Sequence, residues 1–273
     1  MSLDFSDDDI ERYSRHILLP EIGGIGQAKL ARASVLVVGA GGLGSPVLLY
    51  LAAAGVGRIT VVDDDKVDLS NLQRQIAFTT ADIGRPKADA AVAAARALNP
   101  GPVIDAVVAR LDADNAMGLI AAHDVVADGT DNFDTRFLVA DACVLARKTL
   151  VSAAVLRFEG QLSTFKPHAG VDCPCYRCLY PAPPPRGLVP ACSEAGVLGA
   201  VTGVMGTLQA TEIVKEIVGV GGGMAGRLLL WDAMSARMRT IRLPRDPACP
   251  TCGPNAIFRD LSAHGSTKEY ADA

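Results

Sequence analysis

A glycine-rich turn joins a short strand to a helix near the start of the chain. Residues 34–38 read Ser-Val-Leu-Val-Val, an apolar and β-branched run typical of a buried parallel strand. Residues 39–44 follow as Gly-Ala-Gly-Gly-Leu-Gly. A helix is expected over 45–52, with Ser45 as its cap and Pro46 in its first turn. This order predicts a phosphate-binding turn at a helix N-terminus.

A second strand is expected at 58–62, and an acidic residue follows it directly. An acidic side chain at that position suits a ribose hydroxyl, and the glycines allow the backbone to approach a phosphate closely. The predicted nucleotide-binding residues of this segment are Gly39, Gly41, Gly42, Gly44, Asp63 and Asp65. Such a turn serves NAD, FAD and ATP alike, so taken alone it favours a nicotinamide-dependent dehydrogenase.

Strand and helix patterns alternate as far as residue 155. Further strands are expected at 103–108, 124–128 and 149–155, and helices at 86–98, 113–122 and 131–147. Asp131 is expected to cap the last of these helices. The alternation predicts an α/β, Rossmann-like fold with a doubly wound, mainly parallel sheet, whose ligands bind beyond the carboxyl ends of the strands.

The segments on either side of this alternating unit are less regular. A helical segment is expected at 8–32, a hairpin at 157–165 with its turn near Glu159-Gly160, a helix at 196–218, and strands at 228–232 and 236–243. We therefore expect an antiparallel extension of the sheet. One domain is predicted over 8–253, with a nucleotide-binding half at about 30–155, a second half at about 156–253, and a frayed polar tail at 254–273.

The composition argues against nucleic acids and membranes as partners. The 273 residues carry a formal net charge of −4. The acidic start of the chain lacks the basic and apolar layout of a signal peptide, which predicts a cytoplasmic protein. No charge occurs between Glu194 and Glu212, but this stretch is short for a bilayer span and lacks basic or aromatic flanks. A buried helix rich in small residues is therefore favoured.

Two cations and one acidic residue favour ATP over a dinucleotide. Arg74 and Lys87 follow the second strand, and two cations near a phosphate-binding turn suit a triphosphate on which charge develops. Lys87 stands at a helix start, where the dipole disfavours a cation and a bound anion would offset it. Asp131 offers an oxygen ligand for Mg²⁺. The alternatives are that Arg74 is a solvated surface arginine, that Lys87 is an ordinary lysine at a helix start, and that Asp131 is a simple helix cap.

Cysteine spacing divides the seven cysteines into different roles. The pairs Cys175–Cys178 and Cys249–Cys252 supply four thiolates, which predicts a closed structural zinc site against the alternative of unrelated redox pairs. Cys173 leaves the ligand set slightly ambiguous, and Cys143 is expected in the core. Cys192 precedes a helix, a position equally compatible with a nucleophilic thiol and a small buried residue.

In their order along the chain, these motifs resemble a known family. They are Arg-Tyr-Ser-Arg-His-Ile-Leu at 12–18, the glycine run at 39–44, Ser-Asn-Leu-Gln-Arg-Gln at 70–75, Lys87, Gly-Thr-Asp-Asn at 129–132, both Cys-x-x-Cys pairs, and Cys-Ser-Glu-Ala-Gly-Val at 192–197. The combination is similar to the HesA/MoeB/ThiF family, which includes the MoeB and ThiF adenylyltransferases that activate ubiquitin-like sulfur-carrier proteins. Cys173 and the Pro-rich segment 181–187 depart from the expected pattern.

The resemblance implies a homodimer that uses Mg²⁺ and ATP to adenylate the C-terminal glycine of a small carrier ending in Gly-Gly. It implies nucleotide contacts by Gly41, Asp63, Asn71, Arg74 and Lys87, with Ser70, Leu72, Gln73 and Asn132 nearby. It also implies magnesium at Asp131, zinc at the paired cysteines, and an Arg15 that reaches the ATP of the neighbouring subunit. Cys192 would match a cysteine whose role differs between members.

The resemblance leaves the pathway and some rival functions open. The carrier would be MoaD-like, ThiS-like or another, for molybdopterin or thiamin biosynthesis, and the sulfur donor would be a separate cysteine desulfurase or rhodanese. Carrier, zinc and dimer contacts would lie in the second half. An NAD(P)-dependent Rossmann oxidoreductase gives no role to Arg74, Lys87 or the paired cysteines. The acidic balance disfavours an ATP-dependent tRNA-modifying dehydratase or a nucleic-acid-binding zinc scaffold.

Overall fold

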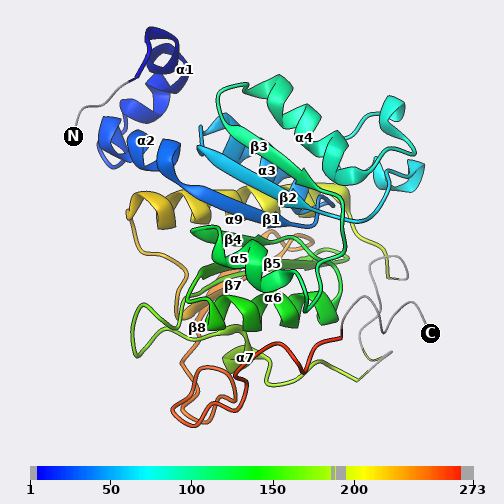
Figure 1. Cartoon of the computed structure of the whole chain (residues 1–273), viewed down its shortest axis with the longest axis vertical. Helices are drawn as coiled ribbons and strands as arrows, with labels where there is room; N and C mark the ends of the chain where they lie inside the picture. Colours follow the sequence, from blue (N-terminus) through cyan, green and yellow to red (C-terminus); the bar gives the residue numbers. More distant parts are fainter. Residues whose placement is uncertain (1–4, 186–187, 189–194, 266–273) are drawn as a thin grey trace.

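The computed structural model describes residues 5–185, 188 and 195–265 as one sheet with helices on both faces (Figure 1). Its strands are β1 (Ser34–Val38), β2 (Arg58–Val62), β3 (Val103–Val107), β4 (Val125–Asp128), β5 (Thr149–Leu156), β6 (Glu159–Phe165), β7 (Arg227–Asp232) and β8 (Arg237–Arg242). They lie in the order β3-β2-β1-β4-β5-β6-β7-β8. The pairs from β3 to β5 are parallel and those from β5 to β8 antiparallel, which confirms the predicted fold class.

Helices bury both faces of the parallel half of the sheet. The helices of the described residues are α1 (Asp7–Ile17), α2 (Gly23–Arg32), α3 (Gly44–Ala53), α4 (Lys87–Leu98), α5 (Ala116–Ala121), α6 (Phe133–Leu145), α7 (Tyr176–Leu179) and α9 (Gly199–Val218), with 3-10 turns η1 (Leu69–Asn71) and η2 (Thr80–Asp82). Val35 and Val37 of β1 enter the core formed with α3, α4 and α9. Leu36 and Val38 enter the core formed with α5, α6 and α7. This two-sided burial explains the continuous apolar sequence of β1.

The order of the strands reverses between β1 and β4. The chain adds β2 and β3 on one side of β1 and then returns to place β4 on the other side. The turns that follow β1 and β4 therefore meet, and a Cβ added to Gly39 would lie 3.1 Å from the carbonyl oxygen of Gly129. Gly39 also has a φ of +86°, a backbone conformation that favours glycine. Ligands of doubly wound sheets bind at such a reversal point.

The helix boundaries differ from the sequence predictions for local reasons. The segment 8–32 forms two helices, because Pro20 lies in the turn between them. The helix expected at 113–122 is the shorter α5, because the Asp112 side chain accepts hydrogen bonds from two backbone N–H groups ahead of it and holds a turn there. The last long helix begins at Gly199, not at Gly196, whose φ is +78°.

The hairpin between β5 and β6 turns two residues earlier than predicted. The turn is Arg157-Phe158, with Arg157 at a φ of 54°, and Glu159 is already paired with Leu156. Gly160 lies inside β6, where a Cβ would come within 2.5 Å of the Met205 side chain of α9. The glycine therefore serves helix-on-sheet packing and not a turn. Apart from β6, every predicted strand boundary is within one residue of the observed one.

The uncharged stretch ahead of Glu212 lies largely in α9, which packs on the sheet. Helix α9 enters the same core as α3 through Met205 and Ile213. A Cβ on Gly206 would lie 2.4 Å from the Pro46 ring of α3, so the small residue permits a close helix crossing. This confirms the predicted buried helix. Within the described ranges, none of the helices has the length and apolar character to cross a membrane.

Residues 254–265 pack onto the fold, so the fraying predicted after Gly253 is wrong as far as residue 265. Leu261 is buried, and His264 Nε2 lies 2.9 Å from Asp141 Oδ2 of α6. The polar composition gave no signal of this, because single side chains and not a periodic pattern make the contacts. Cys143 of α6 is buried, as predicted, and the Pro-rich segment is described only to residue 185.

Candidate active site and metal centre

The turn between β1 and α3 leaves the start of α3 uncapped. Ser45 is not the cap that the sequence predicted, because its hydroxyl donates to the Ala40 carbonyl oxygen at 3.1 Å. No side chain caps the helix, which suits an anion bound at its N-terminus. A Cβ on Gly44 would lie 1.8 Å from the Gly39 carbonyl oxygen, so the turn itself requires that glycine. A Cβ on Gly41 would meet only the Gln75 amide nitrogen, at 3.7 Å.

The two glycines are therefore expected to respond differently to alanine. Gly41→Ala should unfold near the wild-type temperature but bind ATP about tenfold more weakly, because the methyl group occupies the space needed for a phosphate. Gly44→Ala should be strongly destabilised by the clash with Gly39. Thermal unfolding and calorimetric ATP titration measure both effects. Gly118→Ala, where a Cβ meets nothing within 4 Å, is the control. Unchanged ATP affinity in folded Gly41→Ala would contradict a ligand at this turn.

Asp63 holds the glycine turn from the end of β2. Its Oδ2 accepts the Ala40 N–H at 2.7 Å, and its Oδ1 accepts the Asp65 N–H at 2.9 Å. Burial raises the pKa of the Asp63 carboxyl, against the opposing effect of these hydrogen bonds and of Lys87. Lys87 Nζ in turn lies 2.7 Å from Asp65 Oδ2 and is 7% exposed. The Asp63 carboxylate and the Lys87 ammonium group are therefore fixed next to the glycine turn.

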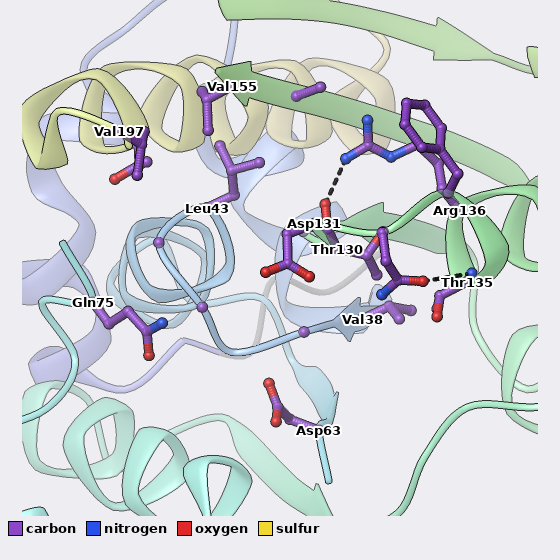
Figure 2. A pocket seen from close by; sticks show the side chains of 18 of the residues that line it. Val38, Leu43, Asp63, Gln75, Thr130, Asp131, Thr135, Arg136, Val155 and Val197 are labelled. Atoms are coloured by element: carbon purple, nitrogen blue, oxygen red, sulfur yellow. Dashed lines mark hydrogen bonds between the residues drawn. The ribbon is translucent and has the colours of Figure 1, made fainter. Parts of the chain in front are cut away.

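Helix α6 is capped by Asn132 and not by Asp131. Asn132 Oδ1 accepts the Thr135 N–H at 2.9 Å, so the predicted capping role of Asp131 is wrong. A cap must reach the third residue of the helix, and Asp131 stands one position too early. The Asp131 carboxylate is exposed and is free to face the glycine turn (Figure 2).

A cavity of about 760 Å³ opens where these turns meet. Figure 2 shows Asp63, Gln75 and Asp131 around it, drawn from three different segments of the chain. Its volume lies in the range of ~300–1,000 Å³ that is usual for small-molecule sites. It brings together nine of the predicted nucleotide-site residues: Gly39, Gly41, Gly42, Asp63, Asp65, Arg74, Lys87, Asp131 and Asn132.

The other predicted residues do not line this cavity. Gly44 is the first residue of α3, and Asn71 uses its Oδ1 to accept the Asp68 N–H at 3.2 Å in a capping box of η1. Arg15 is exposed on α1. Ser70, Leu72 and Gln73 belong to the loop next to the cavity, and Cys192 lies outside the described residues.

Several lining residues were not predicted from the sequence. Arg136, in the first turn of α6, is a cation against the helix dipole, so the argument that selected Lys87 also applies to it. Gln75 is buried, and its Oε1 has no hydrogen-bond partner among the described residues. Tyr180 and Gln161 also line the cavity, and the Tyr180 hydroxyl donates to Gln161 Oε1 at 3.0 Å. No spacing rule connects these two residues, because Gln161 lies in β6 and Tyr180 follows α7, and only the fold brings them together.

Four thiols converge where α7 meets the 249–252 turn. Cys175 Sγ lies 3.9 Å from Cys178 Sγ and 3.4 Å from Cys249 Sγ, and Cys178 Sγ lies 3.5 Å from Cys252 Sγ. Sulfurs bound at ~2.3 Å to one tetrahedral ion are ~3.8 Å apart, whereas a disulfide joins sulfurs at ~2.05 Å. The four thiols therefore fit a closed tetrahedral metal site. Cys173 is not part of the group.

Arg177, which lies between Cys175 and Cys178, anchors this cluster in the fold. Arg177 donates from Nε and Nη2 to the Asp141 carboxylate of α6, at 2.9 and 2.8 Å. Its guanidinium also lies over the Phe137 and Phe258 rings, 4.7 and 4.3 Å from their centroids. Although burial acts to raise it, hydrogen bonds from His264 and Arg177 hold the pKa of Asp141 below its ordinary value. The cluster thus links the end of the described chain to α6.

We expect one zinc ion per chain at this cluster. Cys249→Ser should lose the ion and unfold at a clearly lower temperature, because the metal joins two segments that lie far apart in the sequence. Cys173→Ser, with a thiol outside the group, should keep both metal and stability. Metal analysis and thermal unfolding test this. Purified wild-type protein without zinc, or a Cys175–Cys178 disulfide in freshly reduced protein, would contradict it.

Relatives of this chain cover almost its whole length. A model of the ThiF family matches residues 13–251. The sulfur carrier protein adenylyltransferase of Thermus thermophilus is 49% identical over 93% of this chain and 94% of that protein. The SAMP-activating enzyme E1 of Haloferax volcanii is 46% identical over 94% of each. The adenylyltransferase and sulfurtransferase MOCS3 of Arabidopsis thaliana is 48% identical, and this chain spans 54% of its length.

Solved structures share the fold at low sequence identity. A crystal structure of E. coli MccB with ATP superposes with a TM-score of 0.77 and 20% identity, over 88% of this chain and 74% of that one. A structure of PaaA gives a TM-score of 0.76 and 21% identity, over 90% and 77%. These likenesses support the sheet and helix arrangement described above.

Proposed function

This chain belongs to the ThiF family, and we propose that it is an ATP-dependent adenylyltransferase acting on the C-terminal glycine of a ubiquitin-like sulfur carrier. Relatives that it matches over almost their whole length are named for carrier activation. The observation that carries the proposal is a single cavity in which the glycine turn meets Arg74, Lys87 and Asp131.

In the proposed reaction, a carboxylate oxygen of the carrier tail attacks the α-phosphorus of ATP. The bond to the bridging oxygen breaks, and pyrophosphate leaves with its electron pair. Both reactants are anionic, so the site must supply positive charge and oriented donors. Lys87 and Arg74 provide the charge, and the uncapped start of α3 provides backbone N–H groups. Asp63 is the proposed ribose ligand.

Asp131 is the proposed Mg²⁺ ligand. Its exposed carboxylate on the cavity wall has the oxygen donors that this ion prefers. When bound, the ion would neutralise phosphate charge. The carrier tail would enter past Gln161 of β6 and Tyr180, which also line the cavity. Orienting a tethered carboxylate there converts a bimolecular attack into one within a complex.

The family membership argues against the two rival enzymes. The relatives named above are adenylyltransferases or activating enzymes, not oxidoreductases. A formal net charge of −4 speaks against a tRNA substrate. The proposal includes Zn²⁺ at the four thiols, a homodimer, a cytoplasmic location and a separate sulfur donor. It also includes one domain over 8–253, with the nucleotide at 30–155 and the carrier and dimer contacts at 156–253.

A carrier panel tests the proposed function. Purified protein is incubated with Mg²⁺, ATP and each small Gly-Gly-ended carrier of the source organism. We expect carrier-dependent ATP–pyrophosphate exchange and an acyl-adenylate detected by mass. The matched control is each carrier without its last glycine, which should give neither signal. Absence of both signals with every intact carrier, together with substrate-dependent NAD(P)H formation, would replace the proposal by an oxidoreductase.

A further inference from the structure

A buried carboxylate holds the turn that precedes Asp131. Asp128 ends β4 and is 0% exposed. Its Oδ1 accepts the Thr130 N–H at 3.0 Å and the Thr130 hydroxyl at 2.6 Å. Its Oδ2 accepts the Ser152 hydroxyl of β5 at 2.6 Å. The carboxylate thus fixes the amide side of Thr130 to two neighbouring strands.

Arg136 holds the same residue from its other side. Its Nη2 donates to the Thr130 carbonyl oxygen, as the dashed line in Figure 2 shows. Its Nε lies 3.4 Å from Asp128 Oδ2, which makes a buried ion pair with Arg136 only 7% exposed. Although burial acts to lower it, attraction to Asp128 holds the pKa of Arg136 above its ordinary value. Both peptide groups next to Thr130 are therefore fixed by charged side chains.

A third buried group fixes the strands that carry this network. Gln209 of α9 is 0% exposed, and its Nε2 donates to the carbonyl oxygens of Asp128 and Val151, at 2.8 and 2.9 Å. Gln209 thereby ties the last residue of β4 to an interior residue of the neighbouring strand β5. A buried ion pair seldom stabilises a fold more than apolar residues of the same volume. Stability alone therefore does not explain a charged pair at this position.

We propose that Asp128 and Arg136 are positioning residues that fix the Asp131 carboxylate relative to the glycine turn. Asp131 directly follows Thr130, whose N–H donates to Asp128 and whose carbonyl oxygen accepts from Arg136. Loss of either hydrogen bond to Thr130 lets the Asp131 carboxylate move. Lys87 and Asp63, on the other side of the cavity, keep their own partners. This inference rests on the proposed function only through the role of Asp131.

A set of variants distinguishes an effect on the position of the Asp131 carboxylate from an effect on the stability of the fold. Asp128→Asn weakens the ion pair with Arg136, and Asp141→Asn makes the same change in a second buried Asp–Arg pair, with Arg177, neither of whose residues lines the cavity. Arg136→Met removes the guanidinium, and Arg136→Lys keeps its charge. Where a single variant fails to fold, the double variant Asp128→Asn/Arg136→Met leaves neither charge unpaired. Asp131→Ala is the reference for complete loss of the positioned carboxylate.

Two readouts are expected to move together. In the exchange assay, kcat should fall about 100-fold for Asp128→Asn and Arg136→Met, with the carrier KM little changed and partial recovery in Arg136→Lys. In calorimetry without carrier, the gain in ATP affinity on adding Mg²⁺ should shrink toward that of Asp131→Ala. Asp141→Asn should lower the unfolding temperature and leave both readouts unchanged.

The outcomes are distinct from those that test the proposed function. The ATP-binding measurement needs no carrier, so it decides the inference even where no exchange occurs. Wild-type kcat and Mg²⁺ dependence in folded Asp128→Asn would overturn the inference, as would equal losses in Asp141→Asn. Normal Mg²⁺ dependence in Asp131→Ala would overturn it as well, because no carboxylate would then need positioning.

Discussion

Asp131→Ala is expected to lower carrier-dependent ATP–pyrophosphate exchange by roughly 10²–10³-fold in a protein that stays folded. The carboxylate is exposed on the cavity wall, so its removal leaves no void in the core. Asn132 carries the cap of α6, so the helix also keeps its N-terminal hydrogen bond. The change therefore removes the proposed Mg²⁺ ligand without a matching loss of stability.

Exchange kinetics, thermal unfolding and ATP titration distinguish the effect on catalysis from unfolding. Asp134→Ala is the matched control, because Asp134 is an exposed aspartate in the first turn of α6 that does not line the cavity. Its activity should stay close to wild type. Arg74→Ala should also lose exchange, through weaker stabilisation of phosphate charge. Near-normal exchange in folded Asp131→Ala would contradict the proposed magnesium role.

The parts of the fold that repeat a local pattern were predictable from the sequence. The apolar five-residue strands and the glycine turn follow from residue types at fixed spacing, and their boundaries agree with the structure. The failures occur where one side chain decides the outcome. Arg157 takes a left-handed conformation and moves a turn, and Leu261 and His264 fix a segment whose composition suggested fraying. Neither effect produces a periodic signal.

The candidate site likewise contains residues that could be predicted from the sequence and residues that could not. Motif residues such as Lys87 and Asp131 were found because they stand near strand ends or helix starts, where unusual charge has a physical meaning. Asp128 was not found, because a carboxylate at the end of a buried strand is indistinguishable by spacing from a solvated one. Its role depends on Ser152 and Arg136, which reach it through sheet pairing and a helix turn. Those contacts exist only after the fold has formed.

Arg15 lies at the opposite end of the sheet from the cavity. Tyr13, on the same helix, packs against Gly55, where a Cβ would come within 2.5 Å of its ring, and its hydroxyl accepts from Asn99 Nδ2 at 2.9 Å. Gly55 and Asn99 precede β2 and β3, and therefore mark the amino ends of the strands. The cavity opens at the carboxyl ends, and a five-residue strand spans ~16 Å. Arg15 therefore does not reach the cavity of its own chain.

The role of Arg15 can be tested in the homodimer that the family resemblance implies. Arg15→Ala is expected to lower exchange by roughly 10³-fold, as for an arginine supplied in trans to a phosphoryl site. Arg12→Ala, an exposed arginine on the same helix, is the control and should stay active. When Arg15→Ala and Asp131→Ala chains are mixed, a mixed dimer holds one site with both residues intact. Exchange should then return to roughly a quarter of wild type, because half of the randomised dimers carry one intact site of two.

In the reciprocal mixture, activity is expected to fall and not to recover. A chain with both substitutions, mixed with wild type, forms dimers in which each site lacks one of the two residues. Activity should therefore fall below the value set by the wild-type chains alone. Co-purification of differently tagged chains establishes that subunits have exchanged. Exchange without recovery in the first mixture, or without the extra loss in the second, would mean that Arg15 does not act across the interface.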